Sequence, residues 1–590
     1  MGIVFLIQKA VAEEIKNLYG IDIDPGEIQV SETKPEFEGD YTVLLFALTK
    51  QLKKSPEQIG KELGEQLTKH RADLFSSSNV IKGFLNLSIA DDHWLQFLTL
   101  NFSNEEYGRK PDTGRKVVVE YSSPNTNKPL HLGHLRNNFL GWSISEIFKA
   151  NGYDVKKTAI ANDRGIHICK SMVAWKDFAN GQTPESAGMK GDHLVGDYYV
   201  KFGAEHKKQV KELTEKGLKE EDAEKEAPIM KEAQQMLVDW EAGKEEVVSL
   251  WKKMNEWVYK GFNETYRKIG SDFDKTYYES NVYLLGKQMV EEGLNKSVFY
   301  KKDDGSVWID LTADGLDEKI VQRRDGTAVY ITQDIALVEL KHKEFGAEQS
   351  IYVVGNEQDY HFKVLKLIAQ KLGIEGADGI HHLSYGMVEL PSGRMKTREG
   401  TVVDADDIID EMESISAKHT LELGKVKDFT EEELKQLYTT IGLGALKFFL
   451  LRVDPKKRMV FNPEESIDFH GYTGPFIQYT HARTKSILRK EKPSFGGRGN
   501  DLLPMEKQMI IDLEKYPVII SQAADEMNPS VVASYAFKLA QSFNSFLTGL
   551  KVLTAETPEK KELRLQLAQF TANVLSSSMG LLGIAVPERM

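Results

Sequence analysis

Several features that mark other classes of protein are scarce or missing in this chain of 590 residues. Its single cysteine, Cys169, excludes an internal disulfide framework and a cysteine-rich zinc site. No apolar run approaches the roughly 20 residues of a membrane span, so we expect no membrane partner. A net charge of −13 argues against a generally basic coat for nucleic acid, although local clusters of Lys and Arg can still bind phosphate. We expect the first residues to form a helix rather than a signal peptide, and the protein to be cytoplasmic.

The patterns that are present predict three domains. Residues 1–110 mix helical periods with strand-like runs, which indicates a small α+β domain. Residues 111–410 alternate short β-branched runs with helices, which predicts a parallel sheet covered by helices, interrupted at about 175–290 by a charged helical insertion. Residues 411–590 carry long helical periods and predict an all-α bundle. The strands of the parallel sheet are expected at KVVVEY, DVKKTAIAN, SVWIDL, AVYIT, QSIYVVG and HHLSYGMVEL.

The stretch SSPNTNKPLHLGHLRN places His131 and His134 where the first of these strands gives way to a helix. Three interpretations are open. Zinc binding is disfavoured, because H-x-x-H is not the H-E-x-x-H spacing of two ligands on one helix. The histidines could lie at a helix start without a chemical role. They could also bind an anion, because free N–H groups at a helix N-terminus attract phosphate and open α/β sheets bind ligands at the carboxyl ends of their strands.

A cationic loop, PSGRMKTREG, follows a strand of the same predicted sheet. Arg394, Lys396 and Arg398 alternate along it. One such loop is easily explained as ordinary surface. Together with the histidine turn on the same sheet, it is better explained by a nucleoside triphosphate whose α-phosphate is attacked while pyrophosphate leaves.

At these residues the chain resembles a known family. HLGH resembles the HIGH signature of class I aminoacyl-tRNA synthetases, and RMKTR resembles a divergent KMSKS loop. HIGH alone is shared with small-molecule nucleotidylyltransferases, but further segments in order along the chain resemble the arginyl-tRNA synthetases: EFEGDYTVLLFALTK, YITQDIA, GNEQDYHF, TREGTVV, GPFIQYTHARTKSIL and GLLGIAVPERM. The resemblance implies an α/β fold: a class I Rossmann-like parallel-sheet catalytic domain with a helical insertion, a small α+β N-terminal domain that contacts tRNA, and an all-α C-terminal anticodon-binding bundle.

The resemblance also implies a reaction. L-arginine would react with ATP to give arginyl-adenylate and pyrophosphate, and the arginyl group would then pass to the 3′-terminal adenosine of tRNA(Arg) with release of AMP. ATP would enter with Mg²⁺, no metal would be permanently bound, and the enzyme is expected to be a monomer. Positioning and charge stabilisation would carry the rate, because little covalent chemistry falls to the protein.

The family motifs carry over to named positions of this chain. The catalytic residues implied are Lys128, His131, His134 and Lys396. The ATP contacts implied are Pro124, Asn125, Thr126, Asn127, Lys128, Pro129, Leu130, His131, Leu132, Gly133 and His134 around HIGH, and Arg394, Met395, Lys396, Thr397 and Arg398 in the KMSKS-like loop. The arginine contacts implied are Glu120, Ser123, Asn125, His131, Tyr330, Asp334 and Gln358, of which the two carboxylates suit a planar guanidinium.

The KMSKS-like loop departs from the family pattern. Thr397 stands where the second lysine normally lies, and a hydroxyl cannot offset the charge of departing pyrophosphate. The family often has a lysine just before HIGH, and Lys128 stands there. Its compact ammonium on a flexible stem is our candidate for the missing cation, against the alternative of a solvated loop lysine.

Three other functions compete with this one. A nucleotidyl transferase or an amino acid–amine ligase with the same core would lack the long helical C-terminal region that begins GPFIQYTHAR. A non-catalytic tRNA-binding relative should have lost HIGH or the pocket residues, and this chain keeps both. A dinucleotide-binding oxidoreductase is disfavoured, because no G-x-G-x-x-G follows the first strand of the predicted sheet.

Overall fold

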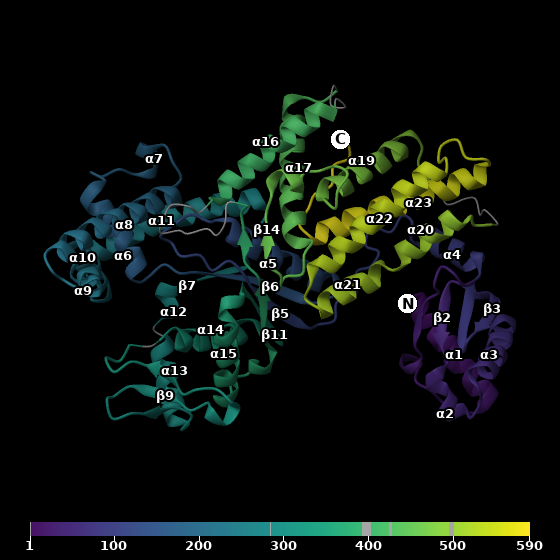
Figure 1. Ribbon diagram of the computed structural model, residues 1–590, viewed down its shortest axis with the longest axis horizontal. Helices are drawn as coiled ribbons and strands as arrows, with labels where there is room; N and C mark the ends of the chain where they lie inside the picture. Colours follow the sequence, from purple (N-terminus) through teal and green to yellow (C-terminus); the bar gives the residue numbers. More distant parts are fainter. Residues whose placement is uncertain (1, 284, 328, 392–402, 424–427, 495–500) are drawn as a thin grey trace.

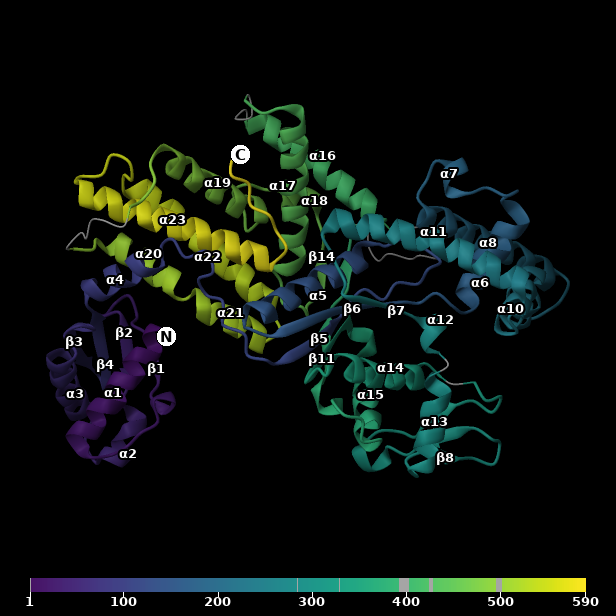
Figure 2. The ribbon, with the colours of Figure 1, turned by 180° about the vertical axis from the view of Figure 1, so that it is seen from behind.

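The computed structural model describes every residue except 1, 284, 328, 392–402, 424–427 and 495–500. The molecule is elongated (Figure 1). A small N-terminal domain lies under the C-terminal helices at one end, and two lobes, one of residues 166–269 and one of residues 285–371, lie at the other. The view from behind shows the same order, with the central sheet between these parts (Figure 2).

The N-terminal domain is built on an antiparallel sheet of four strands in the order β1-β2-β4-β3. These are β1 (Val30–Glu32), β2 (Tyr41–Leu44), β3 (Phe75–Ile81) and β4 (Phe84–Ile89). Helices α1 (Ile3–Tyr19) and α3 (Pro56–His70) pack against the sheet, and α3 starts at a capping box formed by Ser55 and Gln58. The mixed helix and strand content predicted for this region is confirmed.

A parallel sheet of five strands forms the centre of the molecule, in the order β12-β11-β5-β6-β7. Its strands are β5 (Lys116–Glu120), β6 (Asp154–Ala161), β7 (Lys275–Tyr278), β11 (Gln349–Gly355) and β12 (Ile380–Tyr385). The run Val117–Val119 is buried on both faces of β5, as expected for a strand covered by helices on each side. The strand order reverses between β5 and β11, and the crevice at the carboxyl ends of these two strands is where open α/β sheets bind ligands.

The helical insertion lies between β6 and β7. It consists mainly of α6 (Ile166–Phe178), α8 (Gly191–Glu215), α9 (Glu220–Glu226), α10 (Pro228–Glu241) and α11 (Glu245–Ile269), and forms one of the two lobes (Figure 1). The predicted charged helices are therefore confirmed. The stretch expected to be helical also contains β7, an edge strand of only four residues that is too short to give a clear sequence pattern.

Two predicted strands of the parallel sheet are wrong. The run SVWIDL contains β9 (Val307–Ile309), which belongs to a separate antiparallel sheet with β8 (Tyr300–Lys301) and β10 (Lys319–Gln322). The run AVYIT contains the start of α14 (Tyr330–Phe345), a helix that is followed in the same lobe by α15 (Asp359–Lys371). Short apolar runs do not distinguish a strand from a buried helical turn by periodicity alone.

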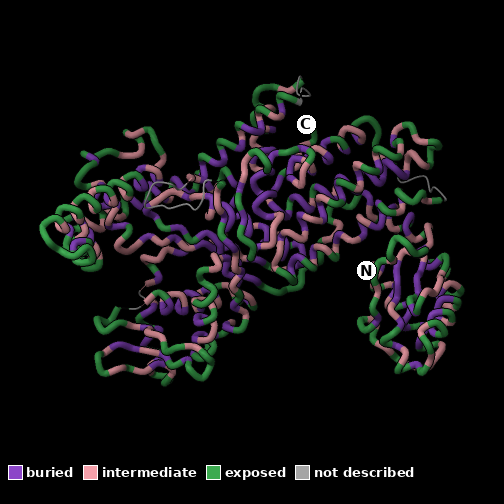
Figure 3. The backbone as a smooth tube through the Cα atoms, viewed as in Figure 1, coloured by how far each residue is buried: buried purple, intermediate pink, exposed green. Residues whose placement is uncertain are grey.

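The C-terminal region is a helical bundle, as predicted. Its longer helices are α16 (Ala405–Leu423), α17 (Glu431–Leu451), α19 (Gly474–Lys490), α20 (Pro504–Glu514), α21 (Tyr516–Asp525), α22 (Pro529–Gly549) and α23 (Pro558–Leu581). These helices pack against one another, and buried residues recur along them between exposed ones (Figure 3). No helix in the described part of the chain is both long and apolar enough to cross a membrane.

The bundle is joined to the central parallel sheet through α5 (Leu132–Ala150), which follows β5. Ser143 Oγ donates a hydrogen bond to the carbonyl of Leu581 at 2.8 Å, and Asn151 Nδ2 donates to that of Ile520 at 3.0 Å. Both donors are buried, so these bonds fix the histidine helix against the C-terminal helices.

Candidate active site

The chain turns sharply where β5 ends. Ser122 adopts a positive φ of 65°, which is uncommon for a residue with a side chain. Its N–H donates to Asn137 Oδ1 at 2.6 Å, and its hydroxyl lies 2.7 Å from that of Tyr266. These buried bonds hold the strained residue and send the following loop over the carboxyl edge of the sheet.

The two histidines form the start of α5. His131 is the N-cap residue, and its Nδ1 accepts a hydrogen bond from the Gly133 N–H at 3.1 Å. His134 Nδ1 accepts from the His131 N–H at 3.1 Å, so the two rings cap the helix reciprocally with their centres 3.9 Å apart. The predicted helix start is confirmed. A Cβ at Gly133 would lie 3.0 Å from His131 Cε1, which is tighter than an ordinary van der Waals contact, so a larger residue here would press on the histidine ring.

This capping fixes the chemistry that the rings can offer. A nitrogen that accepts a backbone N–H carries no proton, so in both neutral rings the proton lies on Nε2. Burial, followed by the charge of Lys128, lowers the pKa of His131 to about 4. Burial, followed by the His131 charge, holds the pKa of His134 well below its ordinary value. At neutral pH the turn therefore presents two uncharged Nε2–H donors.

Acidification is expected to weaken the fold through His131. An unfolded histidine has a pKa of about 6.5, and the folded value is about 4. Between these values only the unfolded state takes up this proton, so stability falls as the pH falls through this range. Allowing for partial exposure, the free energy of unfolding should drop by on the order of 1 to 2 kcal/mol between pH 7 and pH 5. Urea unfolding at pH 7 and at pH 5 measures this drop in the free energy of unfolding. In His131→Asn the drop between the two pH values should be smaller by about 1 to 2 kcal/mol. An unchanged pH dependence in the variant would contradict the assignment.

A cavity of about 200 Å³ lies beside the histidine turn. Its lining includes Lys128 and His131 from the loop, His193 from α8 and Asp404 from the residues before α16. Burial lowers the pKa of the Lys128 ammonium, and no carboxylate in the described part of the chain opposes that shift. The turn thus gathers one cation and two neutral donors.

The other residues expected to bind ATP fall into two groups. Positions 124–130 form the loop between β5 and α5, where Thr126 and Asn127 are buried and the Thr126 N–H donates to the Asn162 carbonyl at 3.1 Å. Leu132 is buried in the first turn of α5. The predicted contacts in the KMSKS-like loop lie outside the described residues: Arg394, Met395, Lys396, Thr397 and Arg398.

The residues expected to bind arginine gather around the strand-order reversal. Glu120 ends β5, Ser123 and Asn125 are exposed on the loop after it, and exposed Gln358 follows β11. Asp334 lies on α14. The structure therefore brings them to one edge of the sheet from three segments that are distant in sequence.

The two carboxylates expected to bind guanidinium both have partners in this structure. The Glu120 carboxylate accepts from the ammonium of Lys341, which is fully buried beneath the ring of Tyr352. Asp334 Oδ2 lies 2.7 Å from His361 Nε2. Arginine would therefore bind to carboxylates that are already oriented, and it would compete with these partners for their oxygens.

Tyr330, also expected to contact arginine, is the first residue of α14 and is 71% exposed. It lies one helical turn before Asp334, as the sequence indicates, and a ligand bound to Asp334 is within reach of a side chain of this length.

A further carboxyl near Asp334 was not foreseen. Burial, together with the charges of Asp163 and Asp334, raises the pKa of Glu279 to about 7, while Arg164 opposes the shift. Such a site would take up a cationic ligand readily, because a positive charge relieves the repulsion between the carboxylates. Glu279 stands in DKTYYESN, which carries no motif, so only its surroundings reveal it.

Asp163 is a structural anchor rather than a ligand. It is buried and accepts from the N–H and hydroxyl of Ser280 at 2.8 and 2.7 Å and from the Tyr259 hydroxyl at 2.8 Å. These bonds hold the turn after β6 against α11 and the start of α12 (Glu279–Val282).

The sheet order and the histidine turn at its reversal are the features of a class I tRNA synthetase. The family model described as "tRNA synthetases class I (R), catalytic domain" matches residues 98–462. Two further models match the flanking regions: the "Arginyl tRNA synthetase N terminal domain" at residues 6–89 and the "DALR anticodon binding domain" at residues 477–590.

Relatives that match over the full length indicate which class I synthetase family the chain belongs to. The chain is 51% identical over 589 residues to the arginine–tRNA ligase of Bacteroides thetaiotaomicron, with 98% of each chain covered. It is 50% identical over 604 residues to that of Flavobacterium psychrophilum, with 100% of each covered. Among solved structures, Thermus thermophilus arginyl-tRNA synthetase is 25% identical with a TM-score of 0.82 over 99% of each chain. The Plasmodium falciparum arginyl-tRNA synthetase shares the fold, with a TM-score of 0.76 at 17% identity over 100% of this chain and 99% of that one. The chain belongs to the arginine–tRNA ligase family.

Proposed function

We propose that the protein activates L-arginine with ATP and transfers it to tRNA(Arg). The observation that carries this proposal is the identity of about half the residues, over the full length, to relatives named as arginine–tRNA ligases. The described site is consistent with it, because carboxylates suited to a guanidinium and donors suited to phosphate meet at one edge of the sheet.

Arginine recognition is proposed to rest on charge and shape. Asp334, Glu279 and Glu120 would receive the guanidinium, with Tyr330 beside Asp334. The α-amino and carboxylate groups would be held by the remaining predicted contacts: Ser123, Asn125, His131 and Gln358. Asn and Gln suit this end of the substrate because each offers both a donor and an acceptor.

ATP is proposed to bind over the histidine turn as its magnesium complex. The Nε2–H groups of His131 and His134 would donate to phosphate oxygens, and the helix N-terminus would add its partial positive charge. As the arginine carboxylate attacks the α-phosphate, these preorganised donors would stabilise the charge that develops there. Lys128 and the loop residue Lys396 would supply the cations.

We propose that tRNA contacts the parts outside the catalytic domain, with domain bounds of 1–110, 111–410 and 411–590. The C-terminal helices would read the anticodon, as the description of the matching domain model indicates. The N-terminal domain lies under these helices in Figure 1, and the Lys507 Nζ on α20 is 2.9 Å from Asp40 Oδ2 of that domain. The N-terminal domain and the C-terminal helices could therefore contact the same tRNA molecule. We further propose that the enzyme is monomeric and cytoplasmic.

A charging assay tests the function. Purified protein is incubated with total tRNA, ATP, Mg²⁺ and each labelled amino acid in turn. Label from arginine alone should enter tRNA, and AMP should form in equal amount. Charging with another amino acid, or with none, would overturn the proposal.

Lys128→Met is expected to slow arginyl-adenylate formation about 10²-fold, in the range of one electrostatic stabiliser. Single-turnover measurements give the rate, and the KM for arginine should stay within a few fold. Lys116→Met is the control, because Lys116 is exposed at the far end of β5. Adding Thr397→Lys to the Lys128→Met variant should restore part of the lost rate if residues 128 and 397 both offset the charge of the departing pyrophosphate. A normal rate in Lys128→Met, with a large loss in Lys396→Met, would assign the catalytic cation to the loop.

A further inference from the structure

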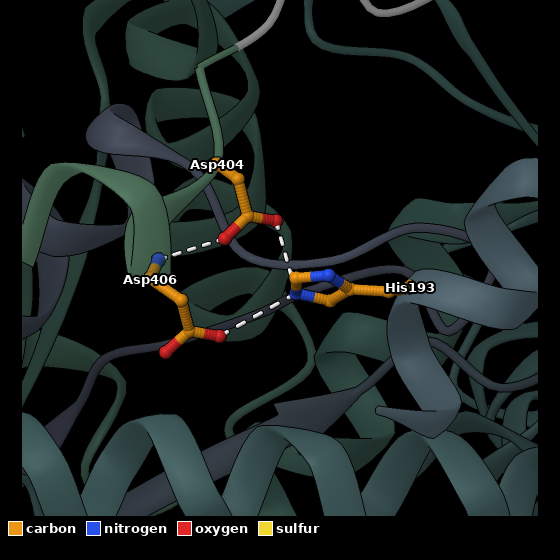
Figure 4. Close-up of side chains that lie close together, drawn as sticks. All are labelled: His193, Asp404 and Asp406. Atoms are coloured by element: carbon orange, nitrogen blue, oxygen red, sulfur yellow. Dashed lines mark hydrogen bonds and ion pairs between the residues drawn. The ribbon is translucent and has the colours of Figure 1, made fainter. Parts of the chain in front are cut away.

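A cluster of charged side chains joins the helical insertion to the start of α16. His193 Nε2, on α8, lies 3.2 Å from Asp404 Oδ2 and 3.4 Å from Asp406 Oδ2 (Figure 4). The three side chains come from two segments that are more than two hundred positions apart and point toward one another. No motif of the sequence drew attention to them.

Two lysines of the insertion complete the cluster. Lys190 Nζ donates to Asp406 Oδ2 at 2.5 Å and to Thr265 Oγ1 at 2.8 Å. Lys268 Nζ, on α11, lies 3.4 Å from Asp406 Oδ1. Burial opposes ionisation of Asp406, but its bonds to His193 and Lys190 outweigh burial and hold its pKa well below the usual range.

Groups of opposite charge face one another in the cluster. Lys190, Lys268 and His193 contact the carboxylates of Asp404 and Asp406, and Lys190 also pairs with buried Asp192. Both lysines bind Asp406, one from the start of α8 and one from α11. A network of several such pairs fixes one relative position of the elements that contribute to it.

The segment that the cluster holds, residues 404–406, contacts the backbone of the histidine turn. The Asp406 N–H donates to Asp404 Oδ1 at 2.7 Å, which sets the turn before α16. Asp404 pairs with His131 as an antiparallel β-bridge, and the Ala405 N–H donates to the Leu130 carbonyl at 2.9 Å. The backbone that precedes the histidine helix is thus held by the cluster. The side chains of His193 and Asp404 also line the cavity beside Lys128 and His131.

We infer that His193 and Asp406 are positioning residues of the reaction: through them the helical insertion holds residues 404–405, and thereby the His131 backbone, in the geometry that binds the ATP phosphates. This inference rests on the proposed role of His131. Displacement of a reacting group by about 1 Å can cost 10²-fold in rate, so a network remote from the chemistry can control it. It also gives the charged insertion a task within the catalytic domain.

His193→Gln and Asp406→Asn test the inference in the full-length enzyme. The kcat of arginine-dependent ATP–pyrophosphate exchange, measured with tRNA present and normalised to titrated active sites, should fall about 10- to 100-fold. The KM for arginine should stay within about twofold, because the carboxylates proposed to bind the guanidinium, Glu120, Glu279 and Asp334, lie on other elements. Asp406→Glu keeps the charge and should recover part of the rate. His193 is partly exposed, so His193→Gln tests the inference even if Asp406→Asn fails to fold.

Asp239→Asn is the matched control. It breaks an ion pair of 2.7 Å with Lys244 inside the same insertion, between α10 and α11, and should leave kcat unchanged. A kcat within twofold of the parent in His193→Gln would overturn the inference. So would a fall in kcat that is matched by a similar rise in arginine KM and a lower unfolding temperature, which would indicate general damage. If the parent enzyme itself fails to charge tRNA with arginine, the proposed function fails instead.

Discussion

His134→Ala should lower the rate of arginyl-adenylate formation by about two to three orders of magnitude, as the loss of one preorganised donor typically does. The ring offers an Nε2–H because its Nδ1 accepts from the His131 N–H, and alanine removes both interactions. Loss of the cap alone should cost only about 1 kcal/mol of stability. Stopped-flow or quenched-flow measurement of a single turnover gives the rate, and the KM for arginine should change little.

His93→Ala is the control for this variant. His93 is a half-buried histidine of the N-terminal domain, stacked edge-on against Trp94, and its replacement should leave adenylate formation unchanged. If His134→Ala kept nearly the parent rate, the two histidines would be helix-capping residues without a role in ATP chemistry.

Asp334→Asn should weaken arginine binding by about 2–5 kcal/mol, because it removes one carboxylate from the charge pair that the bound guanidinium would cover. ATP binding should remain within a few fold, since the histidine turn lies on a different element. Isothermal titration with arginine measures the loss. His361→Gln separates the two partners of Asp334: it removes the imidazole at 2.7 Å but keeps the carboxylate, so arginine binding should persist.

Asp359→Asn is the matched control for Asp334→Asn. Asp359 also pairs with a histidine, with Oδ1 3.2 Å from His382 Nδ1, but it lies on α15, and no arginine contact is expected from it. Equal arginine affinity in Asp334→Asn and the parent would refute the proposed pocket. So would equal use of citrulline by the parent, because citrulline lacks the positive charge that the carboxylates are proposed to recognise.

The sequence predicted those parts of the fold that depend on local pattern. Hydrophobic periodicity changes along residues 116–135, and this change predicted three successive elements. These are the strand that ends at Glu120, the polar loop after it and the helix capped by His131. It failed at Tyr330, where an apolar run was interpreted as a strand although it begins a helix. Run length and composition could not distinguish these possibilities, and the packing of α14 decided between them.

The parts of the site that depend on tertiary contacts could not be predicted. Glu279 acquires its raised pKa from burial and from carboxylates on other segments. Lys341 lies far from Glu120 in sequence, and only the packing of α14 against the sheet brings the two charges together. The same holds for His193, whose partners are Asp404, just before α16, and Asp406 in its first turn. Motifs locate the residues that touch substrates, whereas the residues that support them are set by packing.

The position of β5 inside the sheet has a consequence for synthesis of the chain. β5 ends at Glu120, but its neighbour β11 begins only at Gln349. At 5–20 residues per second, roughly 10–50 s pass on the ribosome between these points. Throughout that time one edge of β5 presents unpaired N–H and C=O groups, which readily pair with other chains. Until Gln349 has been synthesised, this edge of β5 lacks the strand that pairs with it in the folded chain, so it is prone to pair with another chain.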